Sequence, residues 1–270
     1  MQSLQSNSAI SIGKRAVSVR LLRLGYECAV FYFLWAVFGV LSLLWSIPAA
    51  GLYLLLPPRL GVPLGRGAIT AGFRLFIAMM EGSGIIQCDL GALDSLRDSK
   101  SLIIAANHPG RFDVVLVVSR LSRVACIMKA PIWDSLFLGG GARLAGYIRN
   151  DLPMNMIKIA AQEVQSGQSL LVFPEGTRSN PESLSPFQGG IALIAKRAGV
   201  PIQTVFIENN SGFLGKGWPL FKRPPFPLVF RVRLGRRFSV PDDVRSFVAD
   251  FEEYFREELG KQKVASTIRT

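Results

Sequence analysis

The chain has 270 residues, with 31 Lys and Arg against 19 Asp and Glu, so its net charge is +12 when its one histidine is neutral. A single histidine excludes a zinc site with two or three histidine ligands, and any imidazole chemistry must use His108. Three widely spaced cysteines exclude a disulfide framework and a four-cysteine metal site. Because 49% of the residues are hydrophobic and only 19% are charged, intrinsic disorder is excluded as well.

Residues 1–84 are predicted to form a basic and apolar helical segment that associates with a membrane. Residues 14–25 have the pattern of a basic amphipathic helix at a membrane surface. Residues 28–56 carry no charge, and as one helix they would measure about 43 Å, longer than the roughly 30 Å hydrocarbon core of a bilayer. Pro48 and Gly51 interrupt this run, so we predict a kink or re-entrant hairpin near residues 47–51.

Both flanks of the apolar run are basic, with Arg23 before it and Arg59 after it. Because positive flanks favour the cytoplasmic side, a monotopic insertion is favoured over a full crossing, with the following domain facing the cytoplasm. A secretory signal peptide fits poorly, since its apolar region would be only about 7–15 residues long. The alternative is an unusually apolar helix pair buried within a soluble protein.

Residues 85–270 are predicted to form an α/β domain with a mostly parallel central sheet flanked by helices. Apolar runs of strand length alternate there with helical segments, and such alternation is typical of parallel sheets. Strands are expected at residues 101–106, 124–129, 169–173, 201–207 and 228–234. Helices are expected at residues 68–80, 113–121, 155–165, 191–198 and 242–259, with Gly199 as a C-cap.

The positive charge suits anionic lipid headgroups or phosphorylated substrates, because Arg binds phosphate through two parallel hydrogen bonds. Nucleic acid is the rival partner, but the sequence has no zinc finger, no RNP-like aromatic motif and no block of five basic residues. We therefore expect no nucleic-acid partner. The densest basic cluster, at residues 231–237, predicts a strand with a basic face, or simply a solvated sheet edge.

His108 follows a predicted buried strand, in the sequence NHPGRFD. The carboxyl ends of strands are where open α/β sheets bind ligands. A strand–turn–helix junction can bring Asp113 back to the imidazole, where it would fix the tautomer and leave the other ring nitrogen as a base. The alternative is a surface or capping histidine with Asp113 as an ordinary helix N-terminal acid.

A second polar loop, FPEGTRS, follows the strand predicted at residues 169–173. Gly176 would allow close approach of the main chain to a ligand, and Arg178 can hold a phosphate. The alternative is a turn with a Glu–Arg surface pair of little energetic value.

Together, NHPGRFD and FPEGTRS resemble the NHxxxxD and FPEGTR motifs of the glycerolipid acyltransferase (lysophosphatidate acyltransferase) family, in the same order and at a similar separation. The resemblance spans about residues 85–240. It implies His108 and Asp113 as the catalytic pair, and Glu175, Gly176, Thr177 and Arg178 as substrate-binding residues. In the family's middle block, Lys129 and Arg149 are the matching substrate-binding candidates. That block commonly ends Ile-Asp-Arg, whereas this chain has Ile-Arg-Asn-Asp, which leaves the acyl acceptor open.

The resemblance implies a membrane-associated O-acyltransferase. The acyl group would pass from an acyl thioester, either acyl-CoA or acyl carrier protein, to the hydroxyl of a lysophospholipid such as 1-acyl-glycerol-3-phosphate. The thioester is a co-substrate, and neither a cofactor nor a metal is expected. Two alternatives stay open: a phospholipid-remodelling transacylase or an enzyme with a non-glycerophosphate acceptor, and a non-enzymatic basic protein that binds membrane lipid.

Overall fold

The computed structural model describes residues 2–151, 153–179, 184–219 and 222–268, with side chains described from Ser18 to Lys261 within these ranges. The helices are α1 (Gln2–Leu55), α2 (Pro58–Gly82), α3 (Asp113–Arg120), α4 (Ala130–Trp133), α5 (Gly139–Leu144), α6 (Pro153–Gln165), α7 (Gly190–Ala198), α8 (Val244–Ile268) and the 3₁₀ helix η1 (Gly91–Leu96). The strands are β1 (Ile86–Asp89), β2 (Ile103–Ala106), β3 (Val124–Lys129), β4 (Ile148–Asn150), β5 (Ser169–Val172), β6 (Ile202–Asn209) and β7 (Leu228–Phe238).

The seven strands form one sheet in the order β1-β7-β6-β2-β5-β3-β4. Strands β6, β2, β5, β3 and β4 are parallel, and β7 pairs antiparallel with β6 and parallel with β1. The fold is therefore mixed α/β with a mostly parallel sheet, as predicted. The carboxyl ends of the five parallel strands share one edge, which places the loops after β2 and β5 side by side.

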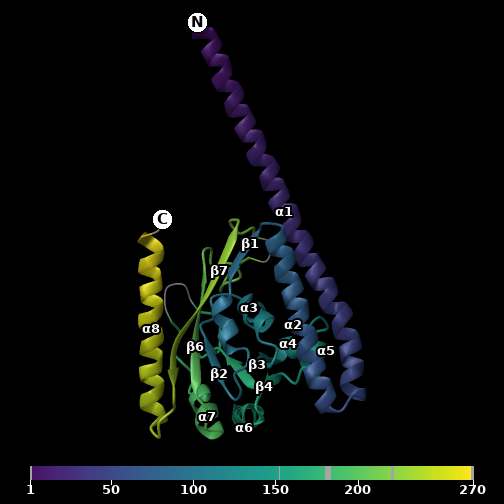
Figure 1. Ribbon diagram of the computed structural model, residues 1–270, viewed down its shortest axis with the longest axis vertical. Coiled ribbons are helices and arrows are strands. Elements are labelled where there is room, and N and C mark those ends of the chain that lie inside the picture. The colour runs from purple at the N-terminus through teal and green to yellow at the C-terminus, as the bar shows by residue number, and fades with distance from the viewer. Residues whose placement is uncertain (1, 152, 180–183, 220–221, 269–270) are drawn as a thin grey trace.

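Helices cover both faces of this sheet (Figure 1). Helices α6, α7 and α8 pack on one face, around Ile103, Ala105 and Leu170. Helices α1, α2, α3 and α5 pack on the other, around Ile104, Ala106 and Leu171. Burial on both faces explains why these strands are continuous apolar runs.

The N-terminal apolar run forms a helical hairpin, but its reversal is not where the sequence predicted. Helix α1 continues through Pro48, so the kink or hairpin expected at residues 47–51 is wrong. The chain reverses at Leu56 and Pro57, where Pro57 has an extended conformation (ψ 148°) and Pro58 begins α2. A residue before proline is disfavoured in the helical conformation, and proline is well suited to the first helical position, so this tandem proline is the stronger signal.

The inner side of the hairpin is attached to the α/β layer. The guanidinium of Arg66 in α2 is buried and donates to the carbonyl of Ala145 at 2.9 Å, to Gln168 at 3.0 Å and to Glu163 at 2.7 Å. At Gly140 in α5, an added Cβ would lie 1.9 Å from the Ser46 carbonyl oxygen of α1, so only glycine permits this helix contact. The described parts of α1 and α2 thus share a hydrophobic core with the α/β layer, and the division of residues 1–84 as a separate domain stays a prediction.

The outer side of the hairpin is apolar and open to solvent. Ser18–Leu55 is long and apolar enough to cross a membrane. An 18-residue stretch within it has a mean hydropathy of 2.1, and only 11% of that stretch is buried. Leu54 and Leu55 at the reversal are 82% and 80% exposed. The N-terminal part of α1 projects beyond the α/β layer (Figure 1).

Candidate active site

The candidate site lies at the carboxyl edge of the sheet, where the loops after β2 and β5 are joined. The Ser179 main-chain N–H donates to the His108 carbonyl at 2.8 Å, and the His108 N–H donates to the Ser179 hydroxyl at 3.2 Å. The imidazole of His108 stacks on the ring of Phe173, with 4.0 Å between ring centroids. The two sequence motifs therefore form one structural unit.

His108 and Asp113 are in direct contact, as the spacing predicted. Nδ1 of His108 lies 2.8 Å from Oδ2 of Asp113, and the imidazole is 17% exposed. With the Asp113 carboxylate ionised, Nδ1–H donates to it and Nε2 is left as the proton acceptor. This geometry is that of a histidine base oriented by a carboxylate.

Asp113 begins α3 and is fully buried. Burial raises the pKa of its carboxyl group, although the hydrogen bond and charge of His108 and the Gly110 N–H act in the opposite direction. The Gly110 N–H donates to Oδ2 at 2.8 Å, while Oδ1 has no hydrogen-bond partner among the described residues. A buried carboxylate with one unpartnered oxygen costs stability, which a purely structural role would not require.

The turn between His108 and Asp113 packs against residues 212–215. At Gly110, an added Cβ would lie 2.6 Å from the Phe213 carbonyl oxygen. The Arg111 N–H donates to the Leu214 carbonyl at 3.3 Å. A glycine is therefore required where this turn approaches the neighbouring loop.

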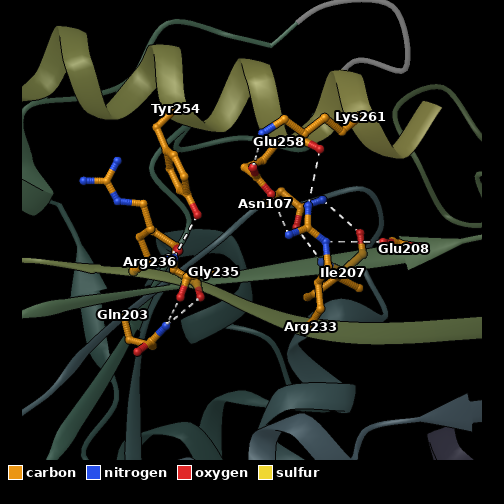
Figure 2. Close-up of polar contacts among 11 residues, drawn as sticks. Asn107, Gln203, Ile207, Glu208, Arg233, Gly235, Arg236, Tyr254, Glu258 and Lys261 are labelled. Carbon is orange, nitrogen blue, oxygen red and sulfur yellow. Dashed lines mark hydrogen bonds and ion pairs between the residues drawn. The ribbon is translucent and has the colours of Figure 1, made fainter. Parts of the chain in front are cut away.

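Asn107, the first residue of NHPGRFD, fastens the end of β2 to β6 (Figure 2). Its side-chain amide donates to the Ile207 carbonyl at 2.9 Å and accepts from the Ile207 N–H at 2.7 Å. Asn107 is 4% exposed. Asn107 therefore has a structural role: its two side-chain hydrogen bonds hold β2 and β6 together just before His108.

Glu175 faces inward and organises its own loop. Its carboxylate accepts hydrogen bonds from the Ser179 hydroxyl and from the Ser185 N–H, the latter at 3.2 Å. Burial raises its pKa, opposed by these two hydrogen bonds and by the charge of His108. These contacts favour a positioning role for Glu175, and its direct binding of substrate stays a prediction.

The remaining residues of FPEGTR are more accessible. Gly176 has a φ of +62° and is exposed, and Thr177 is half-buried. Nη1 of Arg178 donates to the carbonyls of Leu214 and Gly215, at 3.1 and 2.7 Å. Arg178 is therefore anchored through one nitrogen, and its other donors remain available for an anion.

Lys129 and Arg149 lie at the same sheet edge but farther from His108. Both are exposed, at the ends of β3 and β4, and the sheet order places β4 three strands from β2, about 14 Å away. Arg149 pairs with Asp134 at 3.0 Å and with Asp151 at 2.8 Å. The structure therefore brings Arg178 close to the His108 loop and keeps Lys129 and Arg149 at a distance.

Arg149 also lines a cavity of about 540 Å³ next to the hairpin reversal. Most of its wall is apolar, with Tyr53 and Leu56 from the hairpin and Ile159 from α6. His108 does not line this cavity.

The basic cluster of β7 lies outside the candidate site, and Arg233 within it is paired with two acidic residues. The Arg233 guanidinium pairs with Glu258 of α8 at 2.7 Å and with Glu208 at 3.6 Å (Figure 2). The Arg236 main-chain N–H donates to the Tyr254 hydroxyl at 2.8 Å. The predicted strand is present, and its arginines fasten α8 to the sheet.

Three residues at the site escaped the sequence prediction: Phe173, Ser179 and Leu214. Phe173 and Ser179 flank PEGTR directly, so their position in the motif was a usable signal. Leu214 contributes a main-chain carbonyl from a distant loop, and its side-chain type carries no signal for that contact.

Comparison with known proteins agrees with this geometry. Residues 89–208 match the protein-family model described as Acyltransferase. This match supports the resemblance of this part of the chain to the glycerolipid acyltransferase family. The matched part contains both motif loops and ends within β6.

Curated relatives carry acyltransferase names. The chain is 28% identical over 202 residues to a putative 1-acyl-sn-glycerol-3-phosphate acyltransferase of Caenorhabditis elegans, which covers 66% of this chain and 76% of the relative. It is 27% identical over 155 residues to a chloroplastic 1-acyl-sn-glycerol-3-phosphate acyltransferase of Brassica napus, covering 54% and 45%. It is 33% identical over 111 residues to a lyso-ornithine lipid O-acyltransferase of Pseudomonas aeruginosa, covering 40% and 43%. The chain thus spans less than half the length of the latter two relatives.

A solved structure shares the fold. The crystal structure of the 1-acyl-sn-glycerophosphate acyltransferase PlsC from Thermotoga maritima matches with a TM-score of 0.61 and 20% identity, over 89% of this chain and 98% of that chain.

Proposed function

We propose that this protein is a membrane-associated O-acyltransferase that transfers a fatty acyl group from an acyl thioester to the hydroxyl of a lysophospholipid such as 1-acyl-glycerol-3-phosphate. The observation that carries the proposal is the His108–Asp113 contact of 2.8 Å beside the FPEGTR loop, within the matched family domain. The curated relatives named for 1-acyl-sn-glycerol-3-phosphate support this acceptor, and the lyso-ornithine lipid relative supports a second one.

In the proposed reaction, Nε2 of His108 takes the proton of the acceptor hydroxyl while the hydroxyl oxygen attacks the thioester carbonyl. The new C–O ester bond forms, the C–S bond breaks, and the proton passes from the imidazolium to the departing thiolate. Asp113 holds the imidazole through Nδ1 and stabilises its cationic form. Neither motif contains a cysteine, so we expect direct transfer without a thioester on the protein.

Arg178, Thr177 and Gly176 would bind the polar head of a substrate, with Glu175 holding their loop in place. Arg149 and Lys129 would act farther along the sheet edge. The apolar cavity beside Arg149 suits an acyl chain, which needs walls without exposed polar groups. No cofactor is proposed, and the thioester, acyl-CoA or acyl carrier protein, serves as co-substrate.

The exposed apolar face of the hairpin would keep this site at the bilayer, where both the acyl chain and the acceptor reside. Exposed Leu54 and Leu55 at the reversal would enter the hydrocarbon, and the basic flanks would face anionic headgroups on the cytoplasmic side. A monotopic insertion agrees with the attachment of α1 and α2 to the sheet.

The test is a matrix of two donors, acyl-CoA and acyl carrier protein, against a panel of lysolipids that includes 1-acyl-glycerol-3-phosphate and lyso-ornithine lipid. Mass spectrometry of the lipids reads out the product. We expect a diacyl product with one donor class. A folded protein that acylates none of the acceptors would contradict the proposal, and acyl exchange between phospholipids without any thioester would select the transacylase alternative.

A further inference from the structure

The turn that carries the catalytic candidates is supported from the hairpin by Phe112, which directly precedes Asp113. Phe112 is 1% exposed. Its ring packs against Trp35 of α1, with 6.3 Å between ring centroids, and against Phe76 of α2, at 6.1 Å. It also contacts Phe230 of β7, at 5.3 Å. Phe112 therefore joins the hairpin to the sheet, and the next residue along the chain is the buried carboxylate.

Trp35 supports the same turn through a second contact. Its ring centroid lies 6.2 Å from that of Phe213, which is 2% exposed. The carbonyl oxygen of Phe213 is the atom that a Cβ at Gly110 would meet at 2.6 Å. The Gly110 N–H in turn donates to Oδ2 of Asp113 at 2.8 Å. One indole therefore packs against two residues that border the turn near its beginning and its end.

The two catalytic candidates are fixed from different parts of the molecule. The main chain of His108 bonds to Ser179 in the loop after β5, and its imidazole stacks on Phe173. Among the described residues, the carboxylate of Asp113 accepts only from His108 and from the Gly110 N–H, which belong to its own turn. Its position therefore depends on the packing of the turn and of α3, since no hydrogen bond ties this carboxylate to another part of the sheet.

We propose that Trp35 is a positioning residue for the catalytic pair. Through Phe112 and Phe213 it holds the carboxylate of Asp113 within hydrogen-bond distance of the imidazole, so the hairpin that would enter the bilayer also sets the geometry of proton transfer. The inference rests on the proposed function and gives a role to a tryptophan outside both motifs. The geometry matters because a displacement of about 1 Å can lower the rate of a catalysed reaction about 100-fold.

Trp45 provides a matched control on the same helix. It lies about 15 Å farther along α1 than Trp35, at 1.5 Å per residue. Its indole contacts α5, where a Cβ at Gly141 would lie 2.9 Å from Nε1. The indole N–H groups of both tryptophans are buried without a hydrogen-bond partner in the part of the chain that the structure describes. Replacement by leucine therefore removes the same atoms at both positions and breaks no described side-chain hydrogen bond at either.

The first test observes the catalytic pair without turnover. Because the chain has one histidine, ¹⁵N-histidine labelling gives the ring signals of His108 alone. Solid-state NMR of the native protein in phosphatidylcholine–phosphatidylglycerol vesicles at about pH 9, where free imidazole is neutral, should show a proton on Nδ1 and none on Nε2. Trp35→Leu and Phe112→Leu should each give a mixture of the two tautomers, and Trp45→Leu should give the native spectrum. Phe112→Leu keeps the test decisive if Trp35→Leu does not fold.

The second test separates kcat from KM in the donor–acceptor matrix. We expect Trp35→Leu to lower kcat about 30-fold and to leave the KM of both substrates within about 2-fold, because the groups that bind them are unchanged. Trp35→Phe, which retains a ring, should recover most of the loss. Trp45→Leu should keep the native kcat although its unfolding midpoint falls by a similar amount.

The outcomes separate this inference from the proposed function. A native spectrum with its proton on Nδ1 that stays unchanged in the folded leucine variants of Trp35 and Phe112 would overturn the positioning role, as would an equal loss of kcat in Trp45→Leu. A native spectrum without a proton on Nδ1 would contradict the proposed function, and the positioning role with it. The spectra decide the matter even where no acceptor is turned over.

Discussion

The ends of β2 and β5 differ from the ends of β3 and β4 in how their polar residues are held. His108, Asp113 and Glu175 are buried or nearly so, and each is fixed by hydrogen bonds from the other loop or from a neighbouring N–H. Lys129 and Arg149 are exposed, and Arg149 forms ion pairs with the exposed Asp134 and Asp151. All five residues stand at one edge of one sheet.

This difference fits the two tasks that we propose for these residues. Proton transfer needs a fixed distance between donor and acceptor and often a shifted pKa. Burial of the catalytic candidates supplies both, at some cost in stability. Recognition of a polar head tolerates exposed and mobile cations, whose individual energies in water are small. Substitutions at the two pairs of strand ends should therefore differ in size and in kind.

The largest effect in this comparison should come from Asp113→Asn. An amide can pair with the wrong tautomer of His108 and no longer stabilises its cation, so kcat/KM should fall by about 10³. Steady-state kinetics of the native protein and the variant measure this. A loss smaller than about 5-fold would remove Asp113 from the mechanism.

Although Asp113→Asn should lower activity, it should leave the folded protein at least as stable as the native form. Burial raises the folded-state pKa of Asp113, so the folded protein retains this proton at pH values where the unfolded chain, with a pKa of about 3.9, has lost it. Stability therefore falls as the pH rises through this window. Asp113→Asn should unfold at an equal or higher temperature than the native protein at pH 7, and the difference should shrink toward pH 4. A midpoint lowered by more than about 3 °C at pH 7 would contradict this.

A smaller effect should follow Glu175→Gln. The loop would lose its two charge-assisted hydrogen bonds, from the Ser179 hydroxyl and the Ser185 N–H, while its shape stays similar. We expect about a 10-fold loss in kcat/KM, with Ser179→Ala giving a comparable loss because it removes the hydroxyl that bonds both Glu175 and the His108 N–H. If Ser179→Ala retains full activity, the hydroxyl contacts of Ser179 that join the two loops have no role in catalysis.

The smallest effect should come from Arg149→Gln. Its ion pairs are exposed, so unfolding should change by less than about 0.5 kcal/mol. We expect the KM for the acceptor to rise about 3-fold with kcat unchanged. Asp151→Asn is the matched control: it frees Arg149 from one partner and should leave that KM equal or lower. A rise of the same size in both variants would indicate a change of local structure.

The sequence was most informative where residue type and local order determine the outcome. The alternation of apolar strands and helices predicted the mostly parallel sheet, and Gly199 ends α7 in a left-handed conformation as predicted. The spacing of His108 and Asp113 anticipated their contact, since a short turn leaves few other arrangements. The strands β1 and β4 were missed because they are short and partly polar, whereas the equally short β2 and β5 lie in continuous apolar runs.

Contacts that depend on tertiary packing could not be predicted from the sequence. A kink or hairpin was expected near residues 47–51, because Pro48 and Gly51 interrupt the apolar run. Helix α1 continues through both residues, and the chain reverses at Pro57. The inward orientation of Glu175 was also missed, since FPEGTR gives no indication of which side chains face the protein. The carbonyl of Leu214 that joins Arg111 to Arg178 comes from 36 residues beyond Arg178, and only the fold brings it there.

The most direct measurement is a single turnover of the native protein with an isotopically labelled acyl thioester and 1-acyl-glycerol-3-phosphate, stopped at successive times. Direct transfer with His108 as the base predicts that free thiol and labelled diacyl lipid appear at the same rate, with no label on the protein. It also predicts that His108→Ala, with an unchanged circular dichroism spectrum, forms neither. Labelled protein that precedes the lipid product, or transfer by His108→Ala at the native rate, would contradict it.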